Sequence, residues 1–204
     1  MLGTIRIPYI SNQAKWIQNG ITVAGGNGQG PANNQLSGPV NMYVDEYETV
    51  CVAEYFNHRV IQWEKNAVDG QAIAGGNGAG NGSNQLNNPR KVVVDKQNQS
   101  LIICDTSNRR VVRWPRQNGA YGETVIIDIA CAGVAMDNDG YLYVSDIQKH
   151  EVRRWKIGER DGTLVAGGNG PGNGLNQLNT PYHIFVDQDQ SVYVSDHANH
   201  RVVK

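Results

Sequence analysis

The chain has 204 residues, of which 18% are charged and 39% hydrophobic. Its 18 basic and 19 acidic side chains give a formal net charge of −1, so no overall charge attracts it to nucleic-acid phosphates or anionic lipid. The first residues, MLGTIRIPYISNQAKW, lack the features of a signal peptide, and no stretch approaches the roughly 18 apolar residues of a membrane span. We therefore expect a soluble chain with no membrane partner, unless a signal lies upstream, and its compartment stays undefined.

The sequence AGGNG occurs three times, at Ala24–Gly28, Ala74–Gly78 and Ala166–Gly170. These copies begin 50 and 92 residues apart, which indicates a further unit without the glycine segment between the second and third copies. An aspartate marks the same register in all four units, at Asp45, Asp95, Asp137 and Asp187. Self-similarity at a period of about 45 residues predicts a repeat architecture.

Each unit contains short runs rich in Val, Ile, Tyr and Trp and bounded by Gly, Asn, Asp or Pro. In the first unit the runs are VNMYVD, TVCVAE, RVIQW and QAIAGG. These patterns predict β-strands, with no helical periodicity between them. Four strands in a unit of about 45 residues indicate a β-propeller blade. We expect complete antiparallel blades over residues 38–78, 88–128 and 131–168.

A segment of the form D/E-x-x-[NK]-[HR]-[RE]-V follows the second strand of each unit and begins at Glu54, Asp105, Asp146 and Asp196. With YVSD before it and proline before the inner strand, it resembles the NHL-repeat family over residues 20–204. This resemblance implies an all-β propeller, usually of five or six blades, that binds protein or RNA. Kelch and WD40 repeats fit less well, because each GGNG leads into a polar loop and Trp-Asp does not close the units.

The last unit, over residues 181–204, contains two strands and the beginning of a third. Residues 16–25 contain the Trp and the fourth-strand pattern that it lacks, so we expect blade completion between the two termini. Residues 1–19 would then be a lead-in that includes a third-strand-like segment. About four blades are encoded, either as a small ring or as a fragment of a five- or six-bladed one, and the abrupt end favours the fragment.

The repeated Asn-His-Arg segment predicts a structural corner at each blade. Acidic and amide side chains bind nearby backbone N–H groups, and Asn tolerates a left-handed conformation. Three arginines are expected to pair with an acidic side chain of the same or the adjacent blade: Arg59, Arg110 and Arg201. A catalytic residue is needed once per site, whereas this segment occurs once per blade. One tryptophan per unit likewise predicts packing between blades, at Trp16, Trp63, Trp114 and Trp155.

The three cysteines, Cys51, Cys104 and Cys131, are odd in number and lack a C-x-x-C spacing. We expect small buried strand residues and no disulfide framework.

The sequence predicts neither a metal nor a cofactor. Lyases and lactone hydrolases with related propellers bind metal in the central channel, but here only His183 is a suitable ligand. The equivalent inner-strand positions, Asn41, Lys91 and Gly133, form a poor ligand set. The Gly-rich segments lead into strands and not into a helix N-terminus, which argues against a phosphate site.

Side chains that vary between the units should gather on the loop face where the inner strands begin. This expected binding face consists of Tyr55, Phe56, Arg90, Lys91, Gln148, Lys149, Tyr182, His183 and His197. Aromatic rings beside cationic groups suit protein or peptide recognition. We therefore expect a non-catalytic interaction or scaffold module with no catalytic residues. The alternatives are a channel-metal-dependent lyase or lactonase-like enzyme and, third, an RNA-binding domain, for which the surface is sparsely basic.

Overall fold

The computed structural model describes residues 11, 13–15, 19–117 and 119–204. The described residues form antiparallel β-sheets and two single-turn 3₁₀ helices, η1 (Thr106–Asn108) and η2 (His197–Asn199). The first sheet contains β1 (Pro39–Val44), β2 (Val50–Glu54), β3 (Arg59–Trp63) and β4 (Gln71–Gly75). The second contains β5 (Pro89–Asp95), β6 (Ser100–Asp105), β7 (Arg110–Pro115) and β8 (Glu123–Ile127). The third contains β9 (Cys131–Met136), β10 (Tyr141–Asp146), β11 (Glu151–Lys156) and β12 (Thr163–Gly167). The fourth contains β13 (Pro181–Val186), β14 (Val192–Asp196) and β15 (Arg201–Val203).

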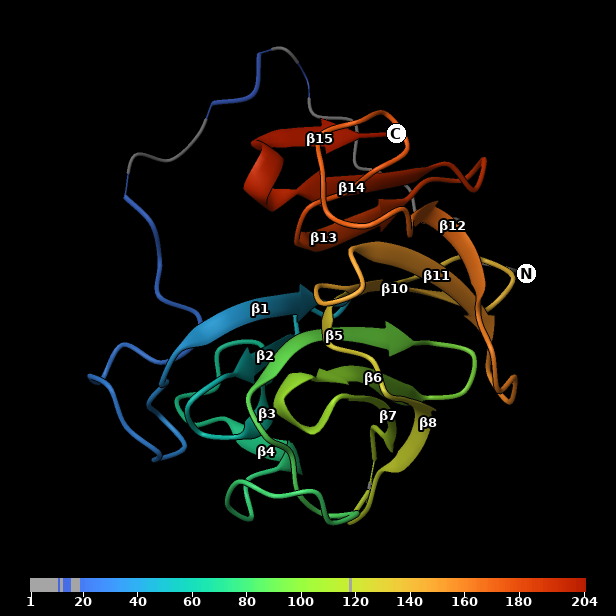
Figure 1. The fold of residues 1–204 in the computed structure, drawn as a ribbon. Helices are drawn as coiled ribbons and strands as arrows, with labels where there is room; N and C mark the ends of the chain where they lie inside the picture. Colours follow the sequence, from blue (N-terminus) through green and yellow to red (C-terminus); the bar gives the residue numbers. More distant parts are fainter. Residues whose placement is uncertain (1–10, 12, 16–18, 118) are drawn as a thin grey trace.

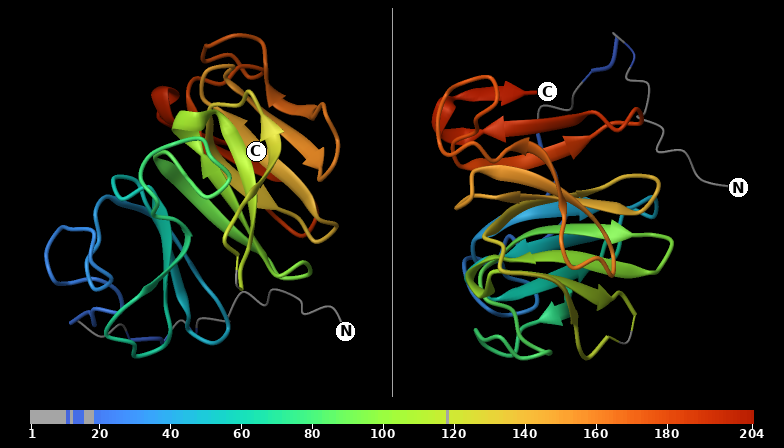
Figure 2. Two further views of the ribbon diagram at one scale, coloured as in Figure 1. Left: turned by 90° about the horizontal axis from the view of Figure 1, so that it is seen from below. Right: turned by 45° about the vertical axis from the view of Figure 1, so that its right-hand side comes forward.

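The four sheets follow one another in chain order around an axis as the blades of a β-propeller (Figure 1). Within each sheet the strands pair in sequence order. The innermost strands contact one another from β1 to β5, β5 to β9 and β9 to β13. No comparably extensive contact joins β13 to β1 in the described part of the chain. The expected all-β propeller with four encoded blades is therefore confirmed, and the blades form a fan that is open between the last and the first (Figure 2).

The fourth blade differs from the expectation that the N-terminal segment completes it. Its sheet has three strands, and residues 19–25 are in no strand. Trp16, which was expected to continue the third strand, lies outside the described residues. The described residues therefore do not supply a fourth strand to this blade.

Apolar side chains fill the space between successive blades. Trp114 packs with Val60, Ala74 and Leu86 between the first and second blades and is 1% exposed. Trp155 packs with Val111 and other apolar side chains between the second and third blades. The expectation of packing between blades is confirmed for Trp114 and Trp155, whereas Trp63 packs against its own blade and the preceding glycine loop, beside Ala24 and Leu36. Burying such aromatic rings contributes several kilocalories per mole each to the packing.

The recurring corner is built around a buried acid. Asp105 accepts a hydrogen bond from the side chain of Asn108, and the Nε of Arg110 lies 2.7 Å from its Oδ2. Arg110 also donates to the backbone carbonyl oxygens of Gly82 and Gln85. The same arrangement recurs around Glu54, Asn57 and Arg59, and around Asp196, Asn199 and Arg201. The expected ion pairs are confirmed, each within one blade, and they bind the preceding glycine loop to the corner.

The glycine loops, residues 24–38, 74–88 and 166–180, have one structure in three copies. Each contains an isolated parallel bridge, at Gln29–Leu36, Ala79–Leu86 and Pro171–Leu178. Asn77 donates a side-chain hydrogen bond to the carbonyl of Asn84, and Gln85 donates one back to the carbonyl of Asn77. These interblade turns are therefore fixed by their own side chains.

The third blade lacks both the loop and the side chains that bind it. Only residues 128–130 connect β8 to β9. Lys149 and Glu151 stand at the positions of the corner Asn and Arg, and Glu151 instead pairs with Arg153 at 2.7 Å. Loss of the loop and loss of its anchoring side chains thus coincide within one chain, as expected if the corner serves the loop.

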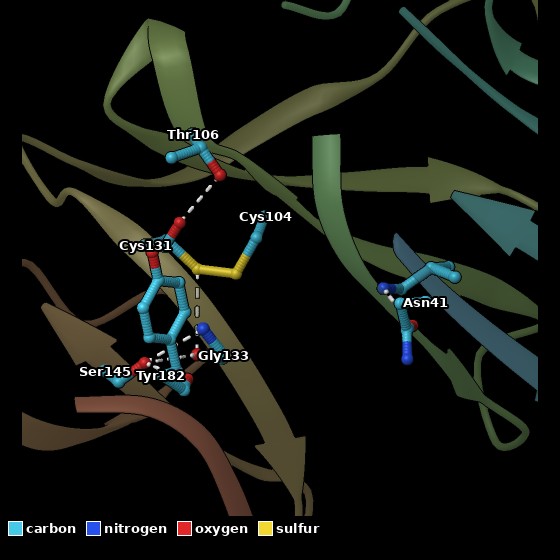
Figure 3. Close-up of a disulfide and its surroundings, with 8 residues drawn as sticks. Asn41, Cys104, Thr106, Cys131, Gly133, Ser145 and Tyr182 are labelled. Atoms are coloured by element: carbon cyan, nitrogen blue, oxygen red, sulfur yellow. Dashed lines mark hydrogen bonds between the residues drawn. A yellow bond between two sulfur atoms is a disulfide. The ribbon is translucent and has the colours of Figure 1, made fainter. Parts of the chain in front are cut away.

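Two of the three cysteines form a disulfide, which corrects the sequence-based expectation. Cys104 on β6 is bonded to Cys131 on β9, with Cα atoms 5.4 Å apart, so the bond joins the second blade to the third (Figure 3). The Oγ of Thr106 donates to the carbonyl of Cys131 at 2.7 Å in the same joint. Cys51 is free and buried, and burial raises the pKa of its thiol to about 11. An odd count and irregular spacing therefore did not exclude one pair across a blade interface.

In the described part of the chain, no helix has the length and apolar character that a membrane crossing requires.

Candidate binding site at the propeller axis

Seven side chains gather at the end of the sheets where the inner strands begin. This axial cluster consists of Tyr55, Phe56, Arg90, Lys91, Tyr182, His183 and His197. Tyr55 and Phe56 follow β2, Arg90 and Lys91 open β5, and Tyr182 and His183 open β13. Three blades therefore contribute to one surface, because the repeat places the same end of each blade at the axis.

Arg90 is the centre of the axial cluster. Its guanidinium carbon lies 5.1 Å from the ring centroid of Tyr55 and 5.6 Å from that of Tyr182. Such cation–π contacts hold a guanidinium in place without neutralising it. The Nε of Arg90 is buried and makes no hydrogen bond with the described residues. Arg90 thus has a fixed position, and its buried Nε has no partner among the described residues.

The rings around Arg90 continue the contact surface in both directions. Phe56 packs edge-on against Tyr55 with ring centroids 5.1 Å apart, and its side chain is 61% exposed. Tyr182 packs against the ring of His197 at 4.8 Å. The Oγ of Ser145 donates to the carbonyl of Tyr182 at 2.9 Å, which holds its backbone against the third blade (Figure 3).

Lys91 and His183 share a weakly solvated part of the axis. Burial lowers the pKa of Lys91. Burial also lowers the pKa of His183, and the positive charge of Lys91 lowers it further. Gly133, the equivalent residue of the third blade, has no side chain, and an added Cβ would collide with the carbonyl of Tyr182. The axis therefore carries a neutral imidazole at pH 7 beside a lysine that forms no ion pair within the described residues.

The two remaining residues of the expected face, Gln148 and Lys149, belong to a different network. Arg109 donates to the side chain of Gln148, and its Nη2 lies 2.6 Å from Oδ1 of Asp128. Lys149 approaches the same carboxylate at 3.7 Å. The hydrogen bond and charge of Arg109, followed by the charge of Lys149, lower the pKa of Asp128.

Sequence reasoning missed Arg109 and the disulfide, although the repeat contained a signal for both. Arg109 stands where the other corners have histidine. Cys131 replaces the proline that opens the other inner strands, and Cys104 replaces a small residue, Ala53 in the first blade. A cysteine that replaces the usual residue in each of two adjacent blades indicates a disulfide between those blades.

The axis is a poor metal site. Among the described residues, no group of three or more His, Cys, Asp or Glu side chains is arranged to hold an ion. At the inner-strand positions only His183 offers a good ligand, beside the cationic Lys91. A metal ion in the channel does not fit these residues.

Fold and site together define the class: this is a β-propeller protein with an aromatic and cationic surface at its axis. No family model matches the chain, and no curated protein matches it. It is similar in structure to a streptogramin B lyase, with a TM-score of 0.61 and 11% identity over 84% of this chain and 51% of that one. It is also similar to a chain of a nidogen/laminin complex, with a TM-score of 0.64 and 14% identity over 80% of this chain and 59% of that one.

A virginiamycin B lyase from Staphylococcus aureus is similar as well, with a TM-score of 0.57 and 12% identity over 84% of this chain and 53% of that one. The chain therefore spans about half the length of these propellers. At such identities the likeness establishes the fold, and the function has to be argued from the site.

Proposed function

We propose that this chain is a non-catalytic, NHL-type β-propeller module that binds a protein or peptide at the axial cluster. The observation that carries the proposal is Arg90, which is fixed between two tyrosine rings from different blades and has an unpaired, buried Nε. The recurring corner, whose acid, Asn and Arg bind the glycine loop, supports the NHL-type assignment.

The chemistry of the cluster indicates which peptides it suits. Tyr, Phe and Arg are enriched where proteins bind one another, and a rigid ring loses little entropy on binding. Neither Arg90 nor Lys91 is paired with a carboxylate of the described chain, so both remain available to an acidic side chain. We expect a ligand that presents an acidic group beside an apolar one that packs on Phe56.

Selection from a displayed peptide library, followed by calorimetry on the selected peptides, tests this proposal. Wild-type protein should enrich acidic, apolar peptides, and Arg90→Ala should weaken their binding about 30-fold or more, as truncation of an interface hot spot does. Arg113→Ala is the matched control, because Arg113 pairs with Glu123 on the exposed side of β7. Absence of enrichment, or equal binding by the two variants, would contradict the proposal.

A second candidate function is a lyase- or lactonase-like enzyme. It is favoured by the similarity in fold to streptogramin B lyase and by the neutral imidazole of His183 at the axis. A stoichiometric, tightly bound zinc or calcium in the purified protein would move the balance to the enzyme. RNA binding is the third candidate, and a salt-dependent gel shift with single-stranded RNA would reveal it.

A further inference from the structure

The sequence contains two Asn-x-Ser motifs, Asn81-Gly82-Ser83 in the glycine loop before the second blade and Asn98-Gln99-Ser100 within that blade. Asn-x-Ser or Asn-x-Thr, with any residue except proline in the middle, is the acceptor motif for N-linked glycosylation. The enzyme that adds the glycan needs an accessible asparagine amide and an accessible hydroxyl two residues later. A short motif also occurs by chance, so the surroundings of the two copies decide which one fits.

The first motif is presented to solvent on an anchored backbone. The carbonyl oxygen of Asn81 accepts a hydrogen bond from Nη1 of Arg110 at 2.9 Å, and that of Gly82 accepts one from Nη2 at 3.2 Å. The carbonyl of Ser83 accepts the N–H of Gly122 at 2.7 Å. Asn81 and Ser83 are exposed, and neither side chain makes a hydrogen bond with the described residues. A glycan on Asn81 would therefore break no hydrogen bond of the described chain.

The second motif is bound into its own blade. The backbone N–H and the side-chain Nδ2 of Asn98 donate to the two carboxylate oxygens of Asp95, at 3.0 Å and 2.7 Å. Asp95 is 3% exposed, and Ser100, the first residue of β6, is 4% exposed with a buried Oγ. Folding of the second blade therefore removes the hydroxyl of this motif from solvent and fixes its asparagine in a turn.

The third glycine loop has the same structure without the motif. Asn173 is the equivalent of Asn81, and its carbonyl likewise accepts a hydrogen bond from Nη1 of the corner arginine, Arg201, at 2.8 Å. Leu175 stands where the second loop has Ser83, and it is 96% exposed. The chain thus contains a matched asparagine in the same setting that lacks the neighbouring hydroxyl.

The disulfide is a second, independent observation, and it concerns the compartment. Bonds such as that between Cys104 and Cys131 form in oxidising compartments, such as the secretory pathway, and are rare in the cytosol. N-linked glycans are added in the lumen of the endoplasmic reticulum, which is an oxidising part of that pathway. One environment therefore suits both the bond between the blades and a glycan on the loop.

We infer that Asn81 carries an N-linked glycan, that Asn98 does not, and that the chain matures in the secretory pathway of a eukaryotic cell. The donor is a lipid-linked oligosaccharide pyrophosphate. Nδ2 of Asn81 forms a bond to the first carbon of the sugar, the bond from that carbon to the pyrophosphate oxygen breaks, and Nδ2 loses one proton. The step is a substitution without oxidation or reduction. The modified residue is not part of the axial cluster, so this inference goes beyond the proposed function.

Peptide mapping of the protein from the cells that naturally produce it tests the site directly. The digest is analysed by mass spectrometry before and after treatment with peptide N-glycosidase, which converts a glycosylated asparagine to aspartate. The peptide that contains position 81 should be detected at its sugar-free mass, with aspartate at this position, only after the treatment. Asn98 should be unmodified throughout. Asn81 without a glycan, or a glycan on Asn98, would overturn the proposal.

An exchange of side chains between the second and third glycine loops provides the matched control. Full-length chains, secreted by cultured eukaryotic cells behind an added signal sequence, are compared on gels with and without the glycosidase. The wild-type chain should carry one glycan and Ser83→Leu none. Ser83→Leu combined with Leu175→Ser should again carry one, now at Asn173.

Both variants should fold, because leucine already occupies this position in the third loop and Leu175 is 96% exposed; thermal unfolding checks this. A wild-type chain without a glycan, a glycan that persists in Ser83→Leu, or a combined variant that stays unmodified would each contradict the inference. Neither measurement involves a peptide ligand, so the outcome does not depend on the proposed function.

Discussion

At each complete corner, an arginine and an asparagine share one buried carboxylate with the backbone of a glycine loop. The side chain of Asp105 is fully buried, and that of Arg110 is 12% exposed. A buried carboxylate that loses its cationic partner keeps its desolvation cost, which makes this pair sensitive to truncation. The corner is therefore the residue-scale feature on which the stability of a blade depends most.

We expect Arg110→Ala to lower the free energy of unfolding by about 3 kcal/mol, because it leaves a buried charge and frees the loop carbonyls. Arg113→Ala, which breaks an ion pair with 35% and 63% exposed side chains, should cost less than about 1 kcal/mol. Urea denaturation of both variants measures the difference. Equal costs would mean that the corner does not stabilise the blade.

At the axis, the pKa of His183 should respond to Lys91. Burial, followed by the charge of Lys91, lowers this pKa from its ordinary value of 6.5. We expect the imidazole to titrate below 6.5 in NMR spectra, and Lys91→Met to raise its pKa while Lys149→Met leaves it in place. Because the folded pKa is depressed, the contribution of His183 to stability is fully present above pH 6.5 and is lost as the pH falls toward the folded pKa. A pKa of His183 that stays the same in Lys91→Met would refute this effect of the Lys91 charge.

At the scale of the element, some glycines of the loops are needed for their positive φ alone, and others also because a neighbouring carbonyl lies where a side chain would be. Gly167 and Gly170 have φ angles of 71° and 72°. A Cβ at Gly167 would collide with the carbonyl of His150, whereas one at Gly170 would meet open space. Substitutions at these two positions therefore compare the cost of backbone strain alone with the cost of strain plus a steric clash.

Gly170→Ala should cost about 1 kcal/mol, the penalty of a left-handed conformation for an L-residue. Gly167→Ala should cost about 3 kcal/mol, since the corner of the same blade must also move. Thermal unfolding of the two variants gives the comparison. A Gly167→Ala cost no larger than that of Gly170→Ala would show that the joint between loop and corner is not tight.

At the scale of the whole molecule, the disulfide joins blades that are otherwise held together by apolar packing and hydrogen bonds. Cys104 and Cys131 are separated by 27 residues, so their bond restricts the unfolded chain around a loop of that length. Both residues are buried, which should protect the bond while the protein stays folded.

Replacing both cysteines by alanine should lower the free energy of unfolding by roughly 3–4 kcal/mol, as expected for a loop of this size. Reductant should lower the wild-type Tm and leave that of the double variant unchanged. Thiol titration in denaturant should find one free thiol, that of Cys51. Three free thiols in oxidised wild-type protein would refute the bond.

The sequence by itself determined the blade and its corner. Strand runs, glycine loops and the recurring acid, Asn and Arg lie within about 30 residues of one another, and local turn chemistry and alternation suffice to place them. The absence of Asn and Arg from the third corner likewise followed from the same register as its missing loop.

Only the tertiary structure showed which side chains of different blades contact one another. Arg90 lies between Tyr55 and Tyr182, Arg109 reaches Gln148, and Cys104 bonds to Cys131. Each contact depends on the angle and distance between neighbouring sheets, which the interblade packing sets and a repeat pattern does not encode. The sequence left both a small ring and a fragment of a larger one open and favoured the fragment, and only the structure shows that β13 and β1 make no extensive contact.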